Sequence, residues 1–299
     1  MRLPCLKISK QDAKDEIARL RRNNFIVPGY RIRREGSEVL IPVRESPVME
    51  DFEEVRERRM RHVGGFDRIS DFFVIREREG WEDVLSEIRE KQNPRAVFLD
   101  TGVQGPFRIR KLKLVHGSGP PAGIHRENGL RYFVDLDKVY FSPRLASIRK
   151  LIVESVLSSG DVDQVVDMYA GVGPISIPIS KGGRRTVAID MNPEAVSILA
   201  KNAMINGTTL HIILADSTAL AECLRHARHV IMNNPTQPLE VTERILGNFS
   251  RGTTVHLTIL GKNEEQLKLK GWEMEEKRTV HGYSPRSSLF YYRLVKGND

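Results

Sequence analysis

Apolar residues recur along the chain with two periods, every second residue or every three to four residues, and these periods predict its strands and helices. In the N-terminal part they predict a strand at residues 5–8, a helix at about 11–23 and a strand at 39–43. Residues 51–62 (DFEEVRERRMRH) are dominated by charge, which is typical of a solvated helix or linker. We therefore expect a small α+β module over residues 1–50, followed by a domain boundary.

The middle of the chain carries a second set of short apolar patterns. They predict another small α+β module over residues 60–141, with strands at 66–75, 95–100, 109–115 and 130–136 and a helix at 81–91. No internal repeat or low-complexity tract interrupts the pattern.

Beyond residue 142 apolar strands alternate with amphipathic helices. This alternation implies a parallel sheet covered by helices. The sequence thus predicts a doubly wound, Rossmann-like α/β domain over residues 142–299, with its ligand at the carboxyl ends of the strands. The predicted strands lie at 165–168, 186–189, 211–213, 229–232, 254–259 and 289–295, and the predicted helices lie near 175 and at 193–206.

Composition excludes some classes of function but does not identify one. The 47 Lys and Arg exceed the 39 Asp and Glu by eight, which favours a polyanionic partner, although charge alone leaves a basic protein without such a partner equally open. Cys5 and Cys223 form no CxxC pair, and neither His125 nor His256 has a partner at metal-ligand spacing, so we expect neither disulfides nor a metal site. No apolar run approaches the roughly 20 residues that span a bilayer, and we expect a cytoplasmic protein.

Three acidic residues follow consecutive strands of the predicted α/β domain. In VVDMYAGVGPISIPIS, Asp167 ends a strand, and Gly171 and Gly173 form a turn whose backbone can approach a ligand closely. Asp190 ends the next strand, where a carboxylate can accept both hydroxyls of a ribose, and Asp216 follows the third, where it can meet an adenine amino group. Because these strand ends share one edge of the sheet, we expect the acids to gather around one ligand.

Two alternatives bear on this site. Each aspartate taken alone can simply cap a helix, but three of them beside a glycine turn favour a ligand. NAD is the rival cofactor, but Ser176 breaks its G-x-G-x-x-G fingerprint and Asp167 would repel a pyrophosphate. S-adenosylmethionine has an amino group and no phosphate, and it fits these residues better.

The strand at 229–232 runs into Asn233, Asn234 and Pro235. An asparagine close to a proline offers a side-chain amide and a rigid carbonyl that can accept a hydrogen bond from a nitrogen nucleophile. Asn-Pro is also common in plain turns, so only the neighbouring cofactor site favours a function here.

Several longer strings are similar to one family. The strings in the first module are PCLKI and VLIPV, those further on are GPFRIRKLKLVHG, IHRENGLRYFVDLDKVYFSPRL and DMYAGVGPISIP, and those near the end are VHLTILGK and GYSPR. Together they resemble the archaeal and eukaryotic tRNA (guanine-37-N1)-methyltransferases. The resemblance covers nearly the whole chain. It implies S-adenosylmethionine as cofactor, tRNA as partner and methyl transfer to N1 of guanosine 37, and we expect a monomer.

The resemblance also implies roles for individual residues. Arg108 would face O6 of the target guanine, and Tyr140 would help to hold the base pocket; without the resemblance, Arg108 would be interpreted as a surface ion-pair residue. Asn233 would border both the cofactor and the base, with Pro235 beside it. The cofactor pocket would be lined by Asp167, Tyr169, Gly171, Asp190 and Asp216.

The chain departs from the family at one position. The family has a glutamate, thought to be the base for the N1 proton, three residues past the FSPRL string, whereas this chain has Ile148. Loss of a general base costs on the order of 10²–10⁴-fold in rate. Three alternatives remain open. Asp137 replaces the base, the enzyme methylates a carbon of a tricyclic guanosine derivative or transfers an aminocarboxypropyl group as wybutosine-pathway relatives do, or the chain binds tRNA and cofactor with weak activity.

Overall fold

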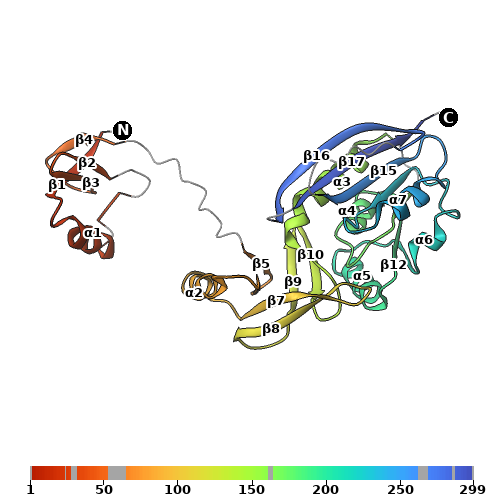
Figure 1. Ribbon diagram of the computed structural model, residues 1–299, viewed down its shortest axis with the longest axis horizontal. Coiled ribbons are helices and arrows are strands. Elements are labelled where there is room, and N and C mark those ends of the chain that lie inside the picture. The colour runs from red at the N-terminus through yellow and green to blue at the C-terminus, as the bar shows by residue number, and fades with distance from the viewer. Residues whose placement is uncertain are drawn as a thin grey trace. The chain divides into compact units, whose positions relative to one another are not determined.

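The computed structural model describes residues 2–23, 25–27, 32–52, 65–160, 164–261, 269–284 and 287–297. The chain divides into two compact units, Met1–Gly64 and Gly65–Asp299 (Figure 1). Most of the predicted charged linker, residues 53–62, lies outside the described residues. The further division of the second unit at residue 142 stays a prediction.

The first unit is a four-stranded antiparallel sheet with one helix. Its strands pair in the order β2-β3-β1-β4, and the apolar side chains of Val39 and Ile41 on β3 pack with Ala13 and Leu20 of the helix. The predicted strands and helix of this module are confirmed. The bounds are β1 (Arg2–Ser9), α1 (Ala13–Arg22), β2 (Arg33–Glu35), β3 (Glu38–Pro42) and β4 (Met49–Asp51).

The second unit begins with a four-stranded sheet of order β5-β6-β7-β8 and a separate hairpin, β9-β10. The single strand predicted at 66–75 is wrong, because Ser70 adopts a φ of 56° and turns the chain into an antiparallel hairpin. The bounds are β5 (Phe66–Ile69), β6 (Phe72–Arg76), α2 (Trp81–Gln92), β7 (Ala96–Gln104), β8 (Ile109–Gly117), β9 (Ala122–Glu127) and β10 (Leu130–Asp135).

A seven-stranded sheet forms the rest of the unit, in the order β13-β12-β11-β14-β15-β17-β16. Its first five strands are parallel, and β17 pairs antiparallel with both β15 and β16, which confirms the predicted doubly wound, Rossmann-like domain. The charge-rich β16 (Trp272–Ser284) was not predicted. The other strands are β11 (Val165–Asp167), β12 (Thr186–Asp190), β13 (His211–Leu214), β14 (His229–Met232), β15 (Thr254–Gly261) and β17 (Ser287–Lys296).

Helices cover this sheet, and one of them ties it to the preceding hairpin. The side chain of Asn202 on α5 accepts a hydrogen bond from the Phe133 N–H at 2.7 Å and donates to the Phe133 carbonyl at 3.0 Å. Asn206 makes the same two bonds with the backbone of Arg131 at 3.0 and 2.7 Å. The helices are η1 (Pro143–Leu145), α3 (Ala146–Ser158), α4 (Ser176–Lys181), α5 (Pro193–Ile205), α6 (Ser217–Leu220) and α7 (Leu239–Leu246).

Candidate active site at the carboxyl ends of the strands

A cavity opens at the carboxyl ends of β11, β12 and β14, where the strand order of the large sheet reverses. Ligands of doubly wound domains bind at such a point. One side of the cavity, the sheet wall, is formed by the loops after β11 and β12 and includes Gly171 and Asp190. A second group of lining residues, the arginine wall, consists of residues 106–108 and 139–142 and includes Arg108 and Tyr140. Of the predicted site residues, the cavity brings together Arg108, Tyr140, Tyr169, Gly171, Asp190, Asn233 and Pro235.

Asp190 is the acidic centre of the sheet wall. Its carboxylate accepts hydrogen bonds from the Gly171 N–H at 2.7 Å and the Asn192 N–H at 2.9 Å. Burial raises the pKa of Asp190, while these backbone donors act to lower it. The two loops are therefore joined by a carboxylate that also faces the cavity.

The two predicted glycines differ in what they do. Gly171 has a φ of 53° and open space where a Cβ would stand, so its backbone is exposed to a ligand. A Cβ on Gly173 would lie 2.2 Å from Leu199 Cδ1 and 2.7 Å from Ile177 Cδ1. Gly173 thus allows α4 and α5 to pack closely, and its prediction as a residue of the cofactor pocket lining is not supported by the structure.

Asp167 lies beneath the glycine turn and does not line the cavity. It is 1% exposed and accepts a hydrogen bond from the Tyr169 N–H at 3.4 Å. Burial raises the pKa of Asp167 to about 7. In the structure its carboxylate binds the backbone of the turn, and the expected contact with the cofactor amino group stays a prediction.

Asp216 does not line the cavity either. Its exposed side chain caps α6, accepting hydrogen bonds from the Thr218 N–H at 2.9 Å and the Thr218 hydroxyl at 2.8 Å. This is the ordinary N-cap role of an aspartate. Of the three acids that the sequence places at strand ends, Asp190 is therefore the one that lines the described cavity.

The residues present fit S-adenosylmethionine. The sheet wall offers a carboxylate suited to ribose hydroxyls, a glycine backbone without a side chain, and the apolar side chains of Val172, Met191 and Ala195.

Arg108 dominates the arginine wall. It closes a turn in which its N–H donates to the Gly105 carbonyl at 3.2 Å, and its φ of 56° is uncommon for a residue with a side chain. Its guanidinium carbon lies 5.8 Å from the centroid of the Tyr140 ring. Backbone strain of this kind is found preferentially at functional sites.

The loop after β14 joins the two walls. The Thr258 hydroxyl donates to Asn233 Oδ1 at 3.0 Å, which leaves the amide NH₂ of Asn233 to donate to a ligand. The Pro235 carbonyl accepts a hydrogen bond from the Leu260 N–H at 2.8 Å and so docks the loop on β15. The expected accepting carbonyl of this loop is therefore already used by the protein at Pro235.

The position of the missing base is apolar. Ile148 is 2% exposed and packs in a cluster with Leu145, Ile152 and Ile175. Asp137 is exposed in the turn after β10 and is not part of the cavity lining, so the structure does not support it as the replacement. Among the described lining residues Asp190 is the one carboxylate.

Sequence reasoning missed one buried ion pair behind the arginine wall. Arg149 lines the cavity and binds Glu127 with two nitrogens, one of them Nε at 2.7 Å, while its Nη1 donates to the Ser142 carbonyl at 3.1 Å. Both partners lie in or next to the strings that carry the family resemblance, but 22 residues separate them and neither carries a local motif. The pair fixes the loop at 139–142 to α3 and β9.

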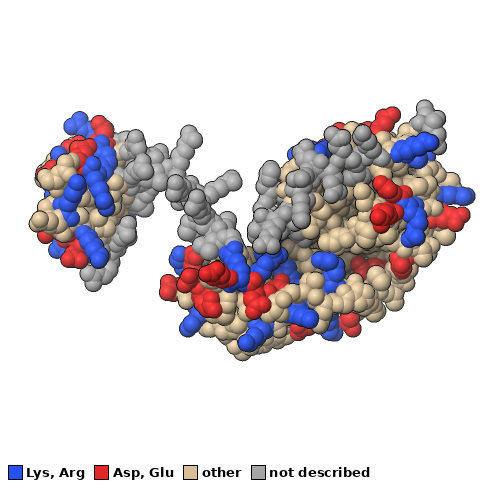
Figure 2. All heavy atoms as spheres, viewed as in Figure 1, with Lys and Arg blue, Asp and Glu red and all other residues tan. Residues whose placement is uncertain are grey.

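Charges of both signs are interspersed over the visible face of the molecule (Figure 2). Within the described ranges, no cluster of three His, Cys, Asp or Glu side chains is arranged to hold a metal ion. No described helix is both long enough and apolar enough to cross a bilayer.

Known proteins share this architecture along the whole chain. The TRM5/TYW2 methyltransferase domain matches residues 123–278, and the tRNA methyltransferase 5 N-terminal domain matches residues 5–53. The tRNA (guanine(37)-N(1))-methyltransferase Trm5b of Methanocaldococcus jannaschii is 32% identical over 95% of this chain and 96% of its own length.

Solved structures give the same result. The complex of aTrm5 with tRNALeu has a TM-score of 0.68 and 30% identity and covers 99% of this chain and 100% of that chain. The M. jannaschii Trm5 structure with adenosine has a TM-score of 0.66 and 29% identity and covers 99% of each chain.

Proposed function

Because the chain belongs to the TRM5/TYW2 methyltransferase family, we propose that it transfers a methyl group from S-adenosylmethionine to N1 of guanosine 37 in tRNA. The observation that carries the proposal is the single cavity in which Asp190 lies on one wall and Arg108 on the other. The first wall suits a nucleoside cofactor and the second suits a base on which negative charge develops. The partner in this proposal is tRNA, bound by a monomer in the cytoplasm.

The chemistry of guanine supports this division of roles. N1 carries a proton and is a poor nucleophile at neutral pH. Because the described lining has no carboxylate besides Asp190, the proton would pass to solvent water, and negative charge would gather on O6. A guanidinium held at Arg108 would stabilise that charge, and the Asn233 amide would donate to the base from the adjoining loop. The Tyr140 ring beside Arg108 limits where the base can lie.

The cofactor side follows from the sheet wall. Asp190 would accept the ribose hydroxyls, and Gly171 would let the cofactor lie against the backbone. When bound, S-adenosylmethionine supplies an electrophilic methyl group on a sulfonium. Holding that group is the task of the strand ends, and orienting the base is the task of Arg108 and Asn233.

Methyl transfer from cofactor labelled in its methyl group tests the proposal. A tRNA transcript with G37 is incubated with the protein, and a transcript with A37 is the control. We expect label in the G37 transcript alone and 1-methylguanosine as the product by nucleoside mass spectrometry. Addition of a 3-amino-3-carboxypropyl group, or cofactor binding without turnover on either transcript, would contradict the proposal.

A further inference from the structure

The arginine wall lies outside the large sheet, so its position depends on other contacts. It is formed by the turn that ends at Arg108 and the loop that contains Tyr140, and both residues also border a second cavity on their far side. Arg108 holds a left-handed φ of 56°, which persists only where surrounding contacts fix it. Arg110 contacts the same Tyr140 ring as Arg108, and it is bound in turn by one carboxylate.

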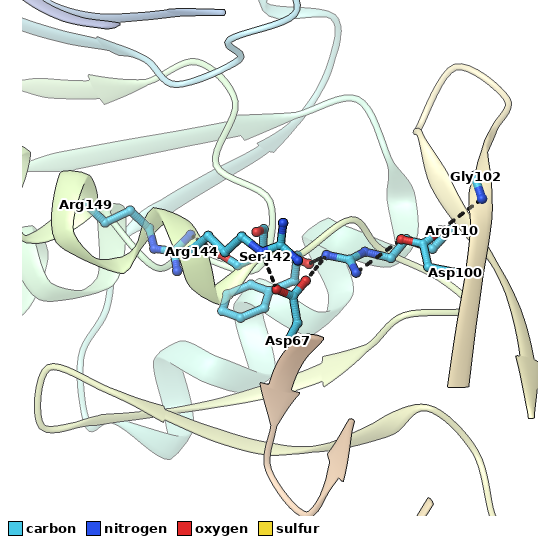
Figure 3. Close-up of polar contacts among 8 residues, drawn as sticks. Asp67, Asp100, Gly102, Arg110, Ser142, Arg144 and Arg149 are labelled. Carbon is cyan, nitrogen blue, oxygen red and sulfur yellow. Dashed lines mark hydrogen bonds and ion pairs between the residues drawn. The ribbon is translucent and has the colours of Figure 1, made fainter. Parts of the chain in front are cut away.

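Asp67 joins three elements that are distant in sequence (Figure 3). This residue of β5 is 4% exposed. Its Oδ2 accepts a hydrogen bond from Arg110 Nη2 of β8 at 2.9 Å, and its Oδ1 accepts one from Arg144 Nε of η1 at 2.7 Å. Figure 3 shows the carboxylate between these two guanidinium groups. Each of its oxygens thus has a cationic partner.

Arg110 connects Asp67 to the arginine wall. Its Nη2 also donates to the Phe141 carbonyl at 2.8 Å, next to Tyr140. Its guanidinium carbon lies 5.6 Å from the centroid of the Tyr140 ring, and that of Arg108 lies 5.8 Å from the same centroid. Both distances are within the roughly 6 Å reach of a cation–π contact. A displacement of Arg110 would therefore move the Tyr140 ring, which also makes the cation–π contact with Arg108.

Loss of the Asp67 charge would disturb this arrangement strongly. Arg110 would retain Asp100, whose Oδ2 lies 3.4 Å from Nη1, but it would face Arg144 without the intervening negative charge. A buried cation that loses its partner moves or draws in water, because burial of an unpaired charge is costly. Such a movement would reach Tyr140 before it reached the cofactor side of the cavity.

We infer that Asp67 is a positioning residue for methyl transfer: by holding Arg110 and Arg144 it sets the place of the Arg108 guanidinium over the target base. The inference rests on the proposed function. It assigns Asp67 no contact with tRNA or cofactor. The whole effect of Asp67 on the rate passes through Arg108 and Tyr140.

The first test compares Asp67→Asn with Asp71→Asn in the full chain. Asp71 is the matched control, since it forms an exposed ion pair with Arg95 at 3.0 Å in the same module. We expect Asp67→Asn to lower the single-turnover rate constant on the order of 10²-fold, the cost of a small misplacement of a reacting group, while cofactor affinity changes less than about twofold. Asp71→Asn should match the wild type. A normal rate for Asp67→Asn, or an equal loss of cofactor affinity, would overturn the inference.

The second test is a double-mutant cycle with Arg108→Ala. If Asp67 acts through Arg108, Asp67→Asn should cause little further loss in the Arg108→Ala background, whereas losses that multiply would refute the inference. If Asp67→Asn does not fold, Asp67→Glu replaces it in both tests, because it keeps the charge and shifts its position; a wild-type rate for that variant is then the refuting result. A wild-type protein without methyl transfer to tRNA would refute the proposed function instead.

Discussion

The two walls of the cavity are held in place by different means. In the sheet wall, Asp190 is the last residue of β12, and its carboxylate binds the N–H of Gly171 in the turn after the adjacent parallel strand β11. In the arginine wall, Arg108 and Tyr140 depend on side-chain contacts with residues such as Asp67. The first wall adjoins the hydrogen-bonded strands of the large sheet, whereas the second is positioned through ion pairs outside that sheet. Substitutions should therefore separate cofactor binding from catalysis.

The largest effect is expected from Arg108→Ala. Removing a fixed donor from a developing negative charge typically costs on the order of 10²–10³-fold in rate. Because Arg108 belongs to the arginine wall, the dissociation constant of S-adenosylmethionine should change by less than about twofold. Single-turnover kinetics and calorimetry measure the two quantities, and equal losses in both would show that the walls do not act separately.

Asp190→Asn should produce the opposite pattern. The substitution removes a charged acceptor that binds two backbone N–H groups and faces the cavity. Loss of one charge-assisted hydrogen bond costs about 1.5–3 kcal/mol, so cofactor affinity should fall roughly 10- to 100-fold. At saturating cofactor the rate constant should change much less. A catalytic defect without weaker binding would contradict the role given to the sheet wall.

Ile148→Glu tests the buried position of the missing base, which packs in the same cluster as the cavity residue Leu145. A carboxylate there would supply the base that the described lining lacks near the arginine wall, and we expect a gain on the order of 10-fold in rate at pH 7. The melting temperature should fall, because Ile148 is buried among aliphatic side chains. Ile148→Gln is the control of similar size, and an equal gain in that variant would rule out proton transfer as the cause.

The last prediction concerns the stability of the large sheet and leaves the rate of methyl transfer aside. His256 is fully buried, with its Nδ1 2.9 Å from the Tyr291 hydroxyl, and burial together with the neighbouring His229 and Arg293 lowers its pKa to about 3. Its contribution to stability is therefore complete above pH 6.5 and is lost as the pH falls toward 3. Between these values the loss is about 1.4 kcal/mol per pH unit.

His256→Gln isolates that contribution. The raised pKa of Asp167 acts in the opposite direction, since a protonated carboxyl stabilises the folded state as the pH falls below about 7. We therefore expect the difference in unfolding free energy between wild type and His256→Gln, measured by denaturant titration, to shrink on acidification from pH 6 to pH 4 by about 1.4 kcal/mol per unit. A constant difference would mean that His256 carries no buried neutral imidazole.

The sequence predicted the sheet wall better than it predicted the arginine wall. Strand ends and a glycine turn are local patterns, so Asp190 and Gly171 were identified from the residues themselves. Asp216 has the same local pattern, but an aspartate after a strand caps a helix as readily as it binds a ligand, and the sequence does not distinguish the two roles. Gly173 lies outside the described cavity lining and serves close packing between helices, which also requires glycine.

The arginine wall was predicted only through resemblance. The contact between Asp67 and Arg110 spans 43 residues, and no periodicity links two such positions. The hairpin at 66–76 was also missed, because a serine in the left-handed region gives no sequence signal as strong as glycine or proline. Long-range pairing of charged residues therefore requires the structure.

The asparagines of α5 have a consequence for assembly. Strand β10 has β9 on one side only, and an open strand edge is where another chain can add a strand. Four residues of helix rise about 6 Å and two residues of strand about 6.6 Å, so Asn202 and Asn206 meet Phe133 and Arg131 in register. The helix thus acts as a substitute neighbouring strand, and it closes this edge of the hairpin to strand exchange with a second copy of the protein.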